Sequence, residues 1–434
     1  MKYNLFNKYL IQKIKNGQIK IGIIGLGYVG LPLAYAFSIK NIDVLGFDID
    51  KKKIEILNSR KSYISYFSAK KIKSMFNKKF TCFNSFEKIN LVDVIILCLP
   101  TPLTKRKTPD MSYIKNSMQK IKKYLRTGQV LSLESTTYPG TCRDILLPIL
   151  QEKFLVGKNF FLVYSPERED PGNKKFPLTS LPKVVGGLTK KCLNIGSRIY
   201  SLLDIKIIKV SSLEIAEFTK LLENIYRSVN IGMVNELKIL CQKMQINIFE
   251  VIKAAKTKPF GFQAFYPGPG YGGHCIPIDP FLLTWRAKQF NFDTKFIKLS
   301  GSINEKMPNI ILKKILYLKK IFGIKKIVIF GIAYKKNVDD IRESPSLKIL
   351  ELLKKSKITT EYIDPYIPII KSRNFKKSKK SLKFNYNLIK KYDLSLILTD
   401  HDVFDYKKIK EFSNIILDCR GRYLPDNKNK IFQG

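Results

Sequence analysis

One cysteine stands in a loop whose composition suits covalent chemistry. Cys275 lies within residues 267–280, a segment rich in glycine and proline, directly after Gly272, Gly273 and His274. A thiolate can trap an aldehyde as a thiohemiacetal, which on oxidation becomes a thioester that water hydrolyses. Such a residue would let one site convert a CH2OH group to a carboxylate without releasing the aldehyde. The two glycines would let the backbone pack close to a ligand, whereas the usual alternative for a cysteine is inert burial.

Polar side chains elsewhere in the chain could support the same chemistry. Lys220 and Asn224 are spaced i, i+4 on a predicted helix and so share one face, where a cation and an amide can stabilise a developing oxyanion. On its residue type alone, Lys220 would be interpreted as a solvated surface lysine. Glu167 follows a predicted strand, where a carboxylate can act through water as a general base, although exposed glutamates are common there. Asp279, late in the cysteine loop, could also be the N-cap of the next helix.

A glycine pattern near the N-terminus predicts a dinucleotide site. Gly25, Gly27 and Gly30 form G-x-G-x-x-G between a predicted strand and a predicted helix. Glycines at these points permit a tight turn and let the helix N-terminus hold a pyrophosphate. Asp48 ends the next strand, where a carboxylate binds the ribose hydroxyls of NAD and repels the 2′-phosphate of NADP. Lys53 could soften that discrimination, and the alternative is an ordinary strand-to-helix turn with a surface aspartate.

The elements that must position these groups alternate along the chain. Strands are predicted at residues 19–25, 44–47, 92–99, 130–135 and 161–164, with a helix at 31–40. Strands that alternate with helices predict a parallel, doubly wound sheet. Residues 214–244 then form a proline-free segment that is apolar at helical spacing. Its clearest stripe is Ile215, Phe218, Leu221, Leu222 and Ile225.

A second strand-and-helix series begins at residues 325–333 and continues with strands near 360–363, 394–398 and 415–417. Within it, Ser344 and Pro345 are typical of an N-cap followed by the first helical residue. We therefore predict an α/β protein with two Rossmann-like doubly wound domains joined by a long helix and a central α-helical domain. The predicted boundaries are 1–208 for an N-terminal NAD-binding domain, 209–315 for the central domain and 316–434 for the C-terminal domain.

Composition narrows the class of protein. The chain has 434 residues, 45% of them hydrophobic, which is enough for two or three packed domains. Its apolar runs are far shorter than the roughly 20 residues of a membrane helix, and the N-terminus has no apolar leader, so we expect a cytoplasmic protein without a membrane span. Seven cysteines without a C-x-x-C pair indicate neither a disulfide framework nor a metal site.

The formal net charge of +43 is the unusual bulk property. Taken alone it would indicate a polyanion as partner. The lysines, however, are spread along the whole chain in short runs, as in a protein shaped by AT-rich codon usage. We expect no nucleic-acid partner, and the alternative from another class is a polyanion-binding protein on a degenerate enzyme scaffold.

From Ile19 to about Tyr423 the chain resembles the family of UDP-glucose and GDP-mannose dehydrogenases. Besides the glycine loop it shares L-P-T-P at 99–102, S-T-T-Y-P-G at 135–140, Y-S-P-E-R at 164–168, K-L-L-E-N at 220–224, G-G-H-C-I-P-I-D at 272–279, and G-I-A-Y-K at 331–335 with D-D-I-R-E-S-P at 339–345. The resemblance implies a two-step, four-electron, NAD-dependent oxidation of the C6 alcohol of a UDP-sugar, for surface polysaccharide biosynthesis. It also implies a homodimer or a larger homo-oligomer.

The resemblance further implies roles for individual residues. The catalytic set is Cys275 as nucleophile, Lys220 and Asn224 at the oxyanion, Asp279 at the hydrolytic water, and Glu167 and Thr136 near the reacting carbon. NAD would be held by Gly25, Gly27, Tyr28, Val29, Gly30, Asp48, Lys53, Thr101, Thr136 and Arg342. The UDP-sugar would contact Glu167, Lys220, Asn224, Tyr266, Gly270, Lys335 and Arg422.

The choice of sugar rests on two segments. Residues 265–280 and 165–172 look like the subgroup that acts on UDP-N-acetylglucosamine. In the glucose-oxidising subgroup a lysine commonly precedes the aspartate, where this chain has Ile278, so UDP-glucose is the alternative substrate. UDP-N-acetylhexosamines that are epimers of one another cannot be separated by residue types. The second α/β domain lacks the glycine fingerprint, so we expect it to bind the sugar nucleotide rather than another NAD.

Overall fold

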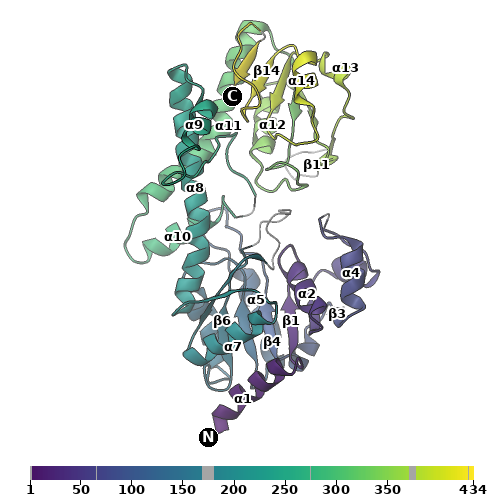
Figure 1. Ribbon diagram of the computed structural model, residues 1–434, viewed down its shortest axis with the longest axis vertical. Coiled ribbons are helices and arrows are strands. Elements are labelled where there is room, and N and C mark those ends of the chain that lie inside the picture. Colours follow the sequence, from purple (N-terminus) through teal and green to yellow (C-terminus); the bar gives the residue numbers. More distant parts are fainter. Residues whose placement is uncertain (1, 65, 169–179, 274, 371–377, 429) are drawn as a thin grey trace. The chain divides into compact units, whose positions relative to one another are not determined.

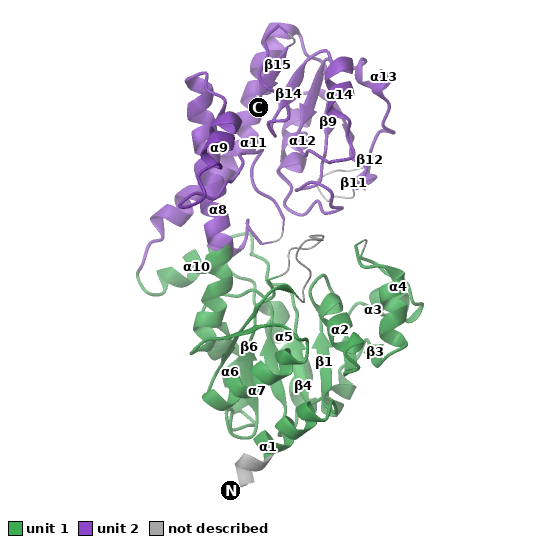
Figure 2. Ribbon diagram, viewed as in Figure 1, with its two compact units in different colours: residues 1–223, 281–291 green, residues 224–280, 292–434 purple. Residues whose placement is uncertain are grey.

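The computed structural model describes the chain except for residues 1, 65, 169–179, 274, 371–377 and 429. The chain divides into two compact units (Figure 1, Figure 2), residues 1–223 with 281–291 and residues 224–280 with 292–434. His274 and residues 169–172 of the predicted motifs therefore lie outside the described residues. Within the described part, no helix is long and apolar enough to cross a membrane. The three predicted domain boundaries stay a prediction.

The first unit is built on an eight-stranded sheet with the order β3-β2-β1-β4-β5-β6-β7-β8. Neighbouring strands are parallel except β6 and β7, which are antiparallel. The predicted doubly wound sheet is confirmed, and the antiparallel strand is one that the sequence pattern did not indicate. The strands are β1 Lys20–Ile24, β2 Asp43–Phe47, β3 Phe80–Phe83, β4 Val94–Leu97, β5 Val130–Leu133, β6 Phe161–Tyr164, β7 Lys183–Gly187 and β8 Ile207–Lys209.

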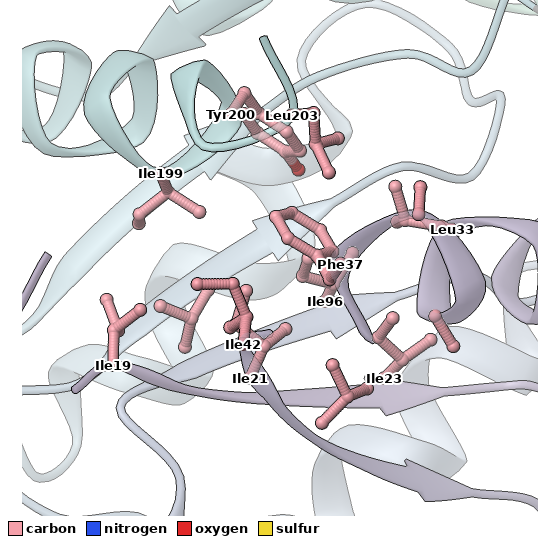
Figure 3. Close-up of a cluster of buried hydrophobic side chains, with 14 of the residues drawn as sticks. Ile19, Ile21, Ile23, Leu33, Phe37, Ile42, Ile96, Ile199, Tyr200 and Leu203 are labelled. Carbon is pink, nitrogen blue, oxygen red and sulfur yellow. The ribbon is translucent and has the colours of Figure 1, made fainter. Parts of the chain in front are cut away.

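Helices connect these strands and cover the sheet (Figure 1). They are α1 Lys2–Lys15, α2 Gly30–Ile39, α3 Lys51–Asn58, α4 Ala69–Phe76, α5 Ser112–Ile121, α6 Leu147–Gln151 and α7 Lys190–Ser201, with short helical turns η1 Glu87–Leu91, η2 Lys122–Tyr124 and η3 Cys142–Leu146. Figure 3 shows the apolar core where Ile21 and Ile23 of β1 meet Phe37 of α2 and Ile199 of α7. Burying each such side chain contributes about 1.5–3 kcal/mol, so this core holds the glycine loop after β1 on a firm base.

The long helix is α8, Leu213–Lys243, which confirms the helix predicted at 214–244. The predicted apolar stripe is divided between two faces. Leu221 and Ile225 are buried, whereas Ile215, Phe218 and Leu222 are exposed by 46%, 41% and 57%. Other helices of this central region are α9 Ile248–Ala255, α10 Asp279–Lys288 and α11 Lys295–Phe322.

The second unit contains a five-stranded sheet with the order β10-β9-β13-β14-β15, parallel throughout. The second predicted α/β series is therefore confirmed, as is the cap of its first helix, because Ser344 accepts a hydrogen bond from the Ser346 N–H and Pro345 begins α12. Its elements are β9 Lys326–Phe330, α12 Pro345–Lys355, β10 Thr359–Ile363, α13 Tyr386–Ile389, β13 Leu394–Ile397, α14 Tyr406–Phe412, β14 Ile416–Asp418 and β15 Ile431–Gln433, with a β11 Ile369–Ile370 and β12 Lys379–Lys380 ribbon.

Candidate active site

The loops that carry the predicted residues of the first unit leave one edge of its sheet. Strands β1, β2, β4, β5 and β6 are mutually parallel, so their carboxyl ends share that edge. The chain adds β2 and β3 on one side of β1 and β4, β5 and β6 on the other. Open α/β sheets bind ligands in the crevice outside such a switch point.

The glycine loop needs its glycines for definable steric reasons. Gly25 has φ +93°, and a Cβ on Gly30 would lie 1.9 Å from the Gly25 carbonyl oxygen. A side chain at either position would therefore open the turn between β1 and α2. At Gly27, by contrast, a Cβ would meet nothing within 4 Å. That open backbone is the feature expected where a ligand must approach closely.

Asp48 directly follows β2 and is 7% exposed. Its Oδ2 accepts hydrogen bonds from the Leu26 N–H at 2.9 Å and from Lys53 Nζ at 3.2 Å, and its Oδ1 accepts from the Asp50 N–H at 3.0 Å. The carboxylate thus fixes the glycine loop while it adds a negative charge beside it. Because four lone-pair sites exist on a carboxylate, acceptor capacity remains for a ribose hydroxyl.

These features fit a bound NAD. The turn at Gly25 and Gly30 brings the N-terminus of α2 to the crevice, the Gly27 backbone is open, and Asp48 stands where the ribose would lie. Tyr28 is 39% exposed and its ring stacks on Tyr66 at 6.0 Å. Bound NAD would supply a hydride acceptor there.

The loop after β5 is tied to its neighbours on both sides. Ser135 Oγ accepts a hydrogen bond from the Leu99 N–H at 2.8 Å, and the Tyr164 hydroxyl donates to the Ser135 carbonyl at 3.1 Å. Thr101 Oγ1 donates to the Thr136 carbonyl at 2.5 Å. Thr136 itself is half-buried. The predicted cofactor residue Thr101 therefore also has a structural task, which is to hold Thr136 in place.

A buried glutamate that sequence reasoning missed fastens the same loop to α8. Glu217 accepts hydrogen bonds from the Gly140 N–H at 2.5 Å and the Cys142 N–H at 2.9 Å. Burial raises the pKa of Glu217 to about 7, although these backbone donors favour its charged form. Since Lys220 lies one turn further along α8, this contact sets the register between Lys220 and the loop.

On its outer side the loop rests on an aromatic contact. Tyr138, two residues after Thr136, packs against Trp285 of α10 with ring centroids 4.9 Å apart. Arg286 lies over the Tyr138 ring at 5.3 Å and forms an ion pair with Asp144 at 2.9 Å. The Thr136 loop is therefore held by hydrogen bonds on one side and by ring packing on the other.

Lys220 and Asn224 of α8 are both buried, 9% and 7% exposed. A solvated surface lysine is thus the weaker interpretation of Lys220. Asn224 Nδ2 donates to Asp279 Oδ2 at 2.5 Å, and the Asp279 N–H donates to the Cys275 carbonyl at 2.9 Å. Asp279 begins α10 and is 2% exposed. The structure therefore links the predicted oxyanion amide, the carboxylate and the backbone of the cysteine loop.

Cys275 is half-buried. The two preceding glycines were expected to let the backbone approach a ligand, but the close neighbour is the protein itself. A Cβ on Gly272 would lie 2.8 Å from the Cβ of Tyr334, and one on Gly273 would lie 2.9 Å from the Tyr334 ring. The Gly273 N–H also donates to the Arg342 carbonyl at 2.9 Å. The glycines thus pack the cysteine loop against residues 331–342.

The predicted cations of the second unit have different surroundings. Lys335 is half-buried, with its Nζ 6.0 Å from the centre of the Tyr334 ring. Arg342 is exposed and binds Asp340 through Nη2 at 2.7 Å. Arg422 is also exposed, and it forms ion pairs with Asp400 at 2.8 Å and Asp402 at 3.6 Å.

The remaining predicted contacts lie in the loop before Cys275. Tyr266 is 50% exposed, and Gly270 has φ +127° beside the Asn304 carbonyl. Two further residues hold this loop and carried no sequence signal. Asn235 Oδ1 accepts from the Gly268 N–H at 2.9 Å, and the Arg420 guanidinium packs so closely on Gly268 that a Cβ there would lie 2.8 Å from Nη1.

The turn after β9 resembles the glycine loop in one respect only. Gly331 has φ +80°, and Asp364 Oδ2 accepts hydrogen bonds from the Ile332 and Ala333 N–H groups at 2.7 and 3.0 Å. Asp364 is 2% exposed and also bonds the buried His401 at 3.1 Å. Its carboxylate is enclosed by protein, unlike that of Asp48, so it has a structural contact where Asp48 has capacity for a ribose hydroxyl.

Comparison with known proteins identifies three consecutive regions of one family in the chain. The NAD binding domain of the UDP-glucose/GDP-mannose dehydrogenase family matches residues 19–204, its central domain residues 214–306, and its UDP binding domain residues 328–429. A UDP-N-acetyl-D-mannosamine dehydrogenase of Methanocaldococcus jannaschii is 33% identical over 96% of this chain and 93% of its own length. A UDP-N-acetyl-D-glucosamine 6-dehydrogenase of Pseudomonas aeruginosa is 33% identical over 80% of this chain and 83% of its own.

A solved structure shows the same fold. The UDP-D-ManNAc dehydrogenase of Pyrococcus horikoshii superposes with a TM-score of 0.86 and 29% identity, covering 96% of this chain and 99% of that one.

The position of Asp48 predicts that the protein binds NADH at least about tenfold more tightly than NADPH, a difference of about 1.4 kcal/mol. Asp48→Asn should narrow the ratio mainly by improving NADPH binding, because the amide oxygen can still accept from the Leu26 N–H. Fluorescence titration of both reduced cofactors measures this. Asp43→Asn, at the opposite end of β2, is the matched control and should leave the ratio unchanged. Equal affinities in the unsubstituted protein would contradict the assignment of Asp48.

Proposed function

Since the chain belongs to the UDP-glucose/GDP-mannose dehydrogenase family, we propose that it oxidises the C6 hydroxymethyl group of a UDP-N-acetylhexosamine to a carboxylate in two successive steps, in the service of surface polysaccharide biosynthesis. The enzyme class is an NAD-dependent oxidoreductase. The observation that best supports the proposal is the buried link from Asn224 through Asp279 to the backbone of Cys275. An acid-forming dehydrogenase needs a nucleophile, an oxyanion donor and a carboxylate near the hydrolytic water.

In the proposed mechanism the Cys275 thiolate adds to the C6 aldehyde formed in the first oxidation, giving a thiohemiacetal. Loss of a hydride from that carbon then gives a thioester, and water attacks it to release the carboxylic acid and the thiol. NAD, when bound, accepts the hydride in each oxidation. The covalent bond keeps the aldehyde in the site between the two oxidations.

The other residues act on charge and protons. Lys220 and the Asn224 amide are proposed to stabilise the negative charge on the C6 oxygen, where buried donors act strongly. Asp279 is proposed to orient the hydrolytic water while its hydrogen bond holds Asn224. Glu167 is proposed as general base through water, with the Thr136 hydroxyl beside it.

The proposed contacts to the nucleotide and the sugar come from two segments. Lys335 and Arg422 are the cations proposed for the UDP group, and Tyr266 and Gly270 lie in the loop proposed to bind the rest of the UDP-sugar. Arg342 is proposed on the cofactor side. Arg422 would have to exchange carboxylate partners for phosphate, since Asp400 and Asp402 now hold it.

Two UDP-sugars are the candidate substrates. The loop segments favour UDP-N-acetylglucosamine, whereas the M. jannaschii relative, which matches almost the whole chain, carries the name of the mannosamine epimer. These two sugars differ in configuration only at C2. The proposal therefore names the N-acetylhexosamine class and treats the two epimers as candidates.

Incubation with NAD and a panel of UDP-sugars tests the proposal. We expect one UDP-N-acetylhexosamine to yield about two NADH per sugar and an acid product, with UDP-glucose turned over far more slowly. Absorbance measures NADH, and mass spectrometry measures the product. Release of free aldehyde after one NADH, or equal turnover of UDP-glucose, would contradict this proposal.

Cys275→Ser should lower turnover by several orders of magnitude, because a serine hydroxyl has nearly the same shape but is a far weaker nucleophile at neutral pH. The variant should still fold and bind NADH, and mass spectrometry on it can reveal any sugar ester formed at residue 275. The matched control is Cys241→Ser, because Cys241 is also half-buried but lies in α8 outside the glycine loop. Near-normal NADH production by Cys275→Ser would refute covalent catalysis by this residue.

We also propose that two copies of the chain associate through α8. Large apolar side chains recur along this helix at spacings of three, four or seven residues, which keeps them on one face, and they are 39–57% exposed. They are Ile215, Phe218, Leu222, Tyr226, Met233, Leu237 and Leu240. A helix of 31 residues spans about 46 Å, so the face is long enough for a stable contact, and an apolar stripe can pair with its own copy about a two-fold axis.

Leu240→Glu should shift the protein from dimer or larger oligomer toward monomer, since it would bury a charge in the contact. Light scattering after size-exclusion chromatography measures the mass. Leu424→Glu is the matched control, because Leu424 is 69% exposed but lies outside α8. An unsubstituted protein that is monomeric at micromolar concentration would disprove the association.

A further inference from the structure

Three ionisable side chains lie together at the carboxyl edge of the first sheet. Lys183 Nζ is 2.8 Å from Glu134 Oε2 and 3.5 Å from Glu167 Oε2. The exposed fractions of the side chains are 6% for Lys183, 0% for Glu134 and 13% for Glu167. One of the three is the proposed general base, and the other two have no assigned role.

Strand β7, which with β8 runs opposite to the other strands of the sheet, brings Lys183 to this place. Glu134 and Glu167 come just after β5 and β6, which are parallel. Strand β7 runs against β6, with Tyr164 opposite Gly186, so its first residue, Lys183, reaches the edge where β6 ends. In a fully parallel sheet this lysine would lie at the opposite edge.

The backbone around Glu167 is fixed by the same strand. Ser165 Oγ donates to the Val184 carbonyl at 2.8 Å, and Arg168 Nη1 donates to the Pro182 carbonyl at 2.7 Å. Arg168 also forms an ion pair with Glu223 of α8 at 2.7 Å. Glu167 therefore sits on a segment held from both sides, while its carboxylate faces the Lys183 ammonium.

The charges in this cluster do not cancel. One ammonium faces two carboxylates, and Glu134 Oε1 is buried without a hydrogen bond of ordinary length to a described residue, although the Tyr200 hydroxyl interacts with this carboxylate. Burial raises the pKa of Glu134 even though Lys183 opposes that shift. Burial by itself would lower the pKa of Lys183, but the charges of Glu134 and Glu167 outweigh it and raise it. The lysine is therefore a permanent cation whose field the two carboxylates share.

Two other ionisable groups described beside the cluster are the Tyr200 hydroxyl and the Cys98 thiol, and neither can carry a positive charge. Tyr200 of α7 lies under the ammonium, with its ring centre 5.0 Å from Lys183 Nζ, and its hydroxyl bonds Ser132 at 2.8 Å. Cys98, after β4, has its pKa raised well above the usual value by burial and by Glu134. Neither supplies a second cation, and the guanidinium of the neighbouring Arg168 is already paired with Glu223 at 2.7 Å.

We propose that Lys183 and Glu134 are positioning residues for Glu167, with Lys183 holding the Glu167 carboxylate charged and in place and Glu134 limiting how strongly it does so. The inference rests on the proposed role of Glu167 in the oxidation. Lys183 acts on the reaction only through Glu167. Glu134 competes for the same ammonium, so removing Glu134 and removing Lys183 have opposite electrostatic effects on Glu167.

Because the two removals have opposite effects on Glu167, they can be tested against each other, and residues with a merely structural role would not show opposite effects. The variants are Lys183→Met, Glu134→Gln, the double substitution, and Lys183→Arg. The measurement is the pH profile of kcat and kcat/KM with the UDP-N-acetylhexosamine that the unsubstituted enzyme oxidises. Lys183→Met should lower kcat about 10- to 100-fold, less than the roughly 10²–10⁴-fold that a general base itself contributes, because Glu167 is retained, with KM changed less than about threefold.

The direction of the pH shift distinguishes a positioning role from a merely structural one. In Lys183→Met the acid limb of the profile should move to higher pH by about one unit, because the carboxylate loses its cation. In Glu134→Gln it should move to lower pH, because Glu167 then has the ammonium to itself. The double variant should recover part of the lost kcat, and Lys183→Arg should do better than Lys183→Met. Shifts in the same direction in both single variants, or none, would overturn the proposal.

A second measurement does not depend on activity. In Lys183→Met two carboxylates remain without a cation. The folded-state pKa of Glu134, already raised by burial, rises further because Lys183 no longer opposes that shift. The stability that Glu134 contributes is therefore present at low pH and lost as pH rises. The melting temperature of the cofactor-free protein should therefore fall more steeply, as pH rises above the ordinary glutamate range, than in the unsubstituted protein. Adding Glu134→Gln should remove the extra slope.

Equal slopes in Lys183→Met and the double variant would contradict the charge balance on which the proposal rests. If the unsubstituted enzyme oxidised no UDP-sugar, the proposed function and the positioning role would both fail, whereas altered kinetics with no opposed pH shifts would count against the positioning role alone.

Discussion

Parallel strand pairing is the constraint on which the first unit depends. Six neighbouring strands point the same way, so the loops that follow them must gather at one edge. None of those loops needs to be long to meet its neighbours there, and each brings one or two polar side chains. The edge contains the glycine turn, Asp48, Thr136 and Glu167, which together span more than a hundred positions of the chain. The antiparallel entry of β7 then adds a cation, because the start of that strand lies where the others end.

Buried carboxylates repeatedly serve this protein as acceptors for backbone N–H groups at loop and helix starts. Asp48 binds the N–H of Leu26, Asp364 binds those of Ile332 and Ala333, and Glu217 binds those of Gly140 and Cys142. In each case a carboxyl oxygen satisfies donors that the turn leaves without a carbonyl. The two α/β units share this device after their first strands, yet only Asp48 keeps access to a ligand. Enclosure by His401 assigns Asp364 to structure alone.

Local patterns made much of the fold and part of the site predictable. The glycine loop, Asp48, α8 and the Ser344 cap each depend on residues close in sequence, and each was found where the pattern predicted. The antiparallel β7 was missed because strand direction depends on pairing, which periodicity does not reveal. Three charged residues were missed for the same reason, because a charged side chain becomes distinctive only when distant segments pack against it. They are Lys183, Glu217 and Arg420. The glycines before Cys275 were recognised as necessary, but their packing against Tyr334 involves a residue some sixty positions away.

The contact between Tyr138 and Trp285 gives the protein an optical label of its own. The chain has a single tryptophan, and its ring lies 4.9 Å from a tyrosine two residues beyond Thr136. Indole emission responds to the polarity and the quenching groups around the ring, and here those surroundings include Arg286 and the Thr136 loop. Emission from this tryptophan therefore reports on its surroundings, which include the Thr136 loop and residues 109–115, without a dye or a substitution. Displacement of the loop during turnover can be followed as a change of colour or lifetime in real time.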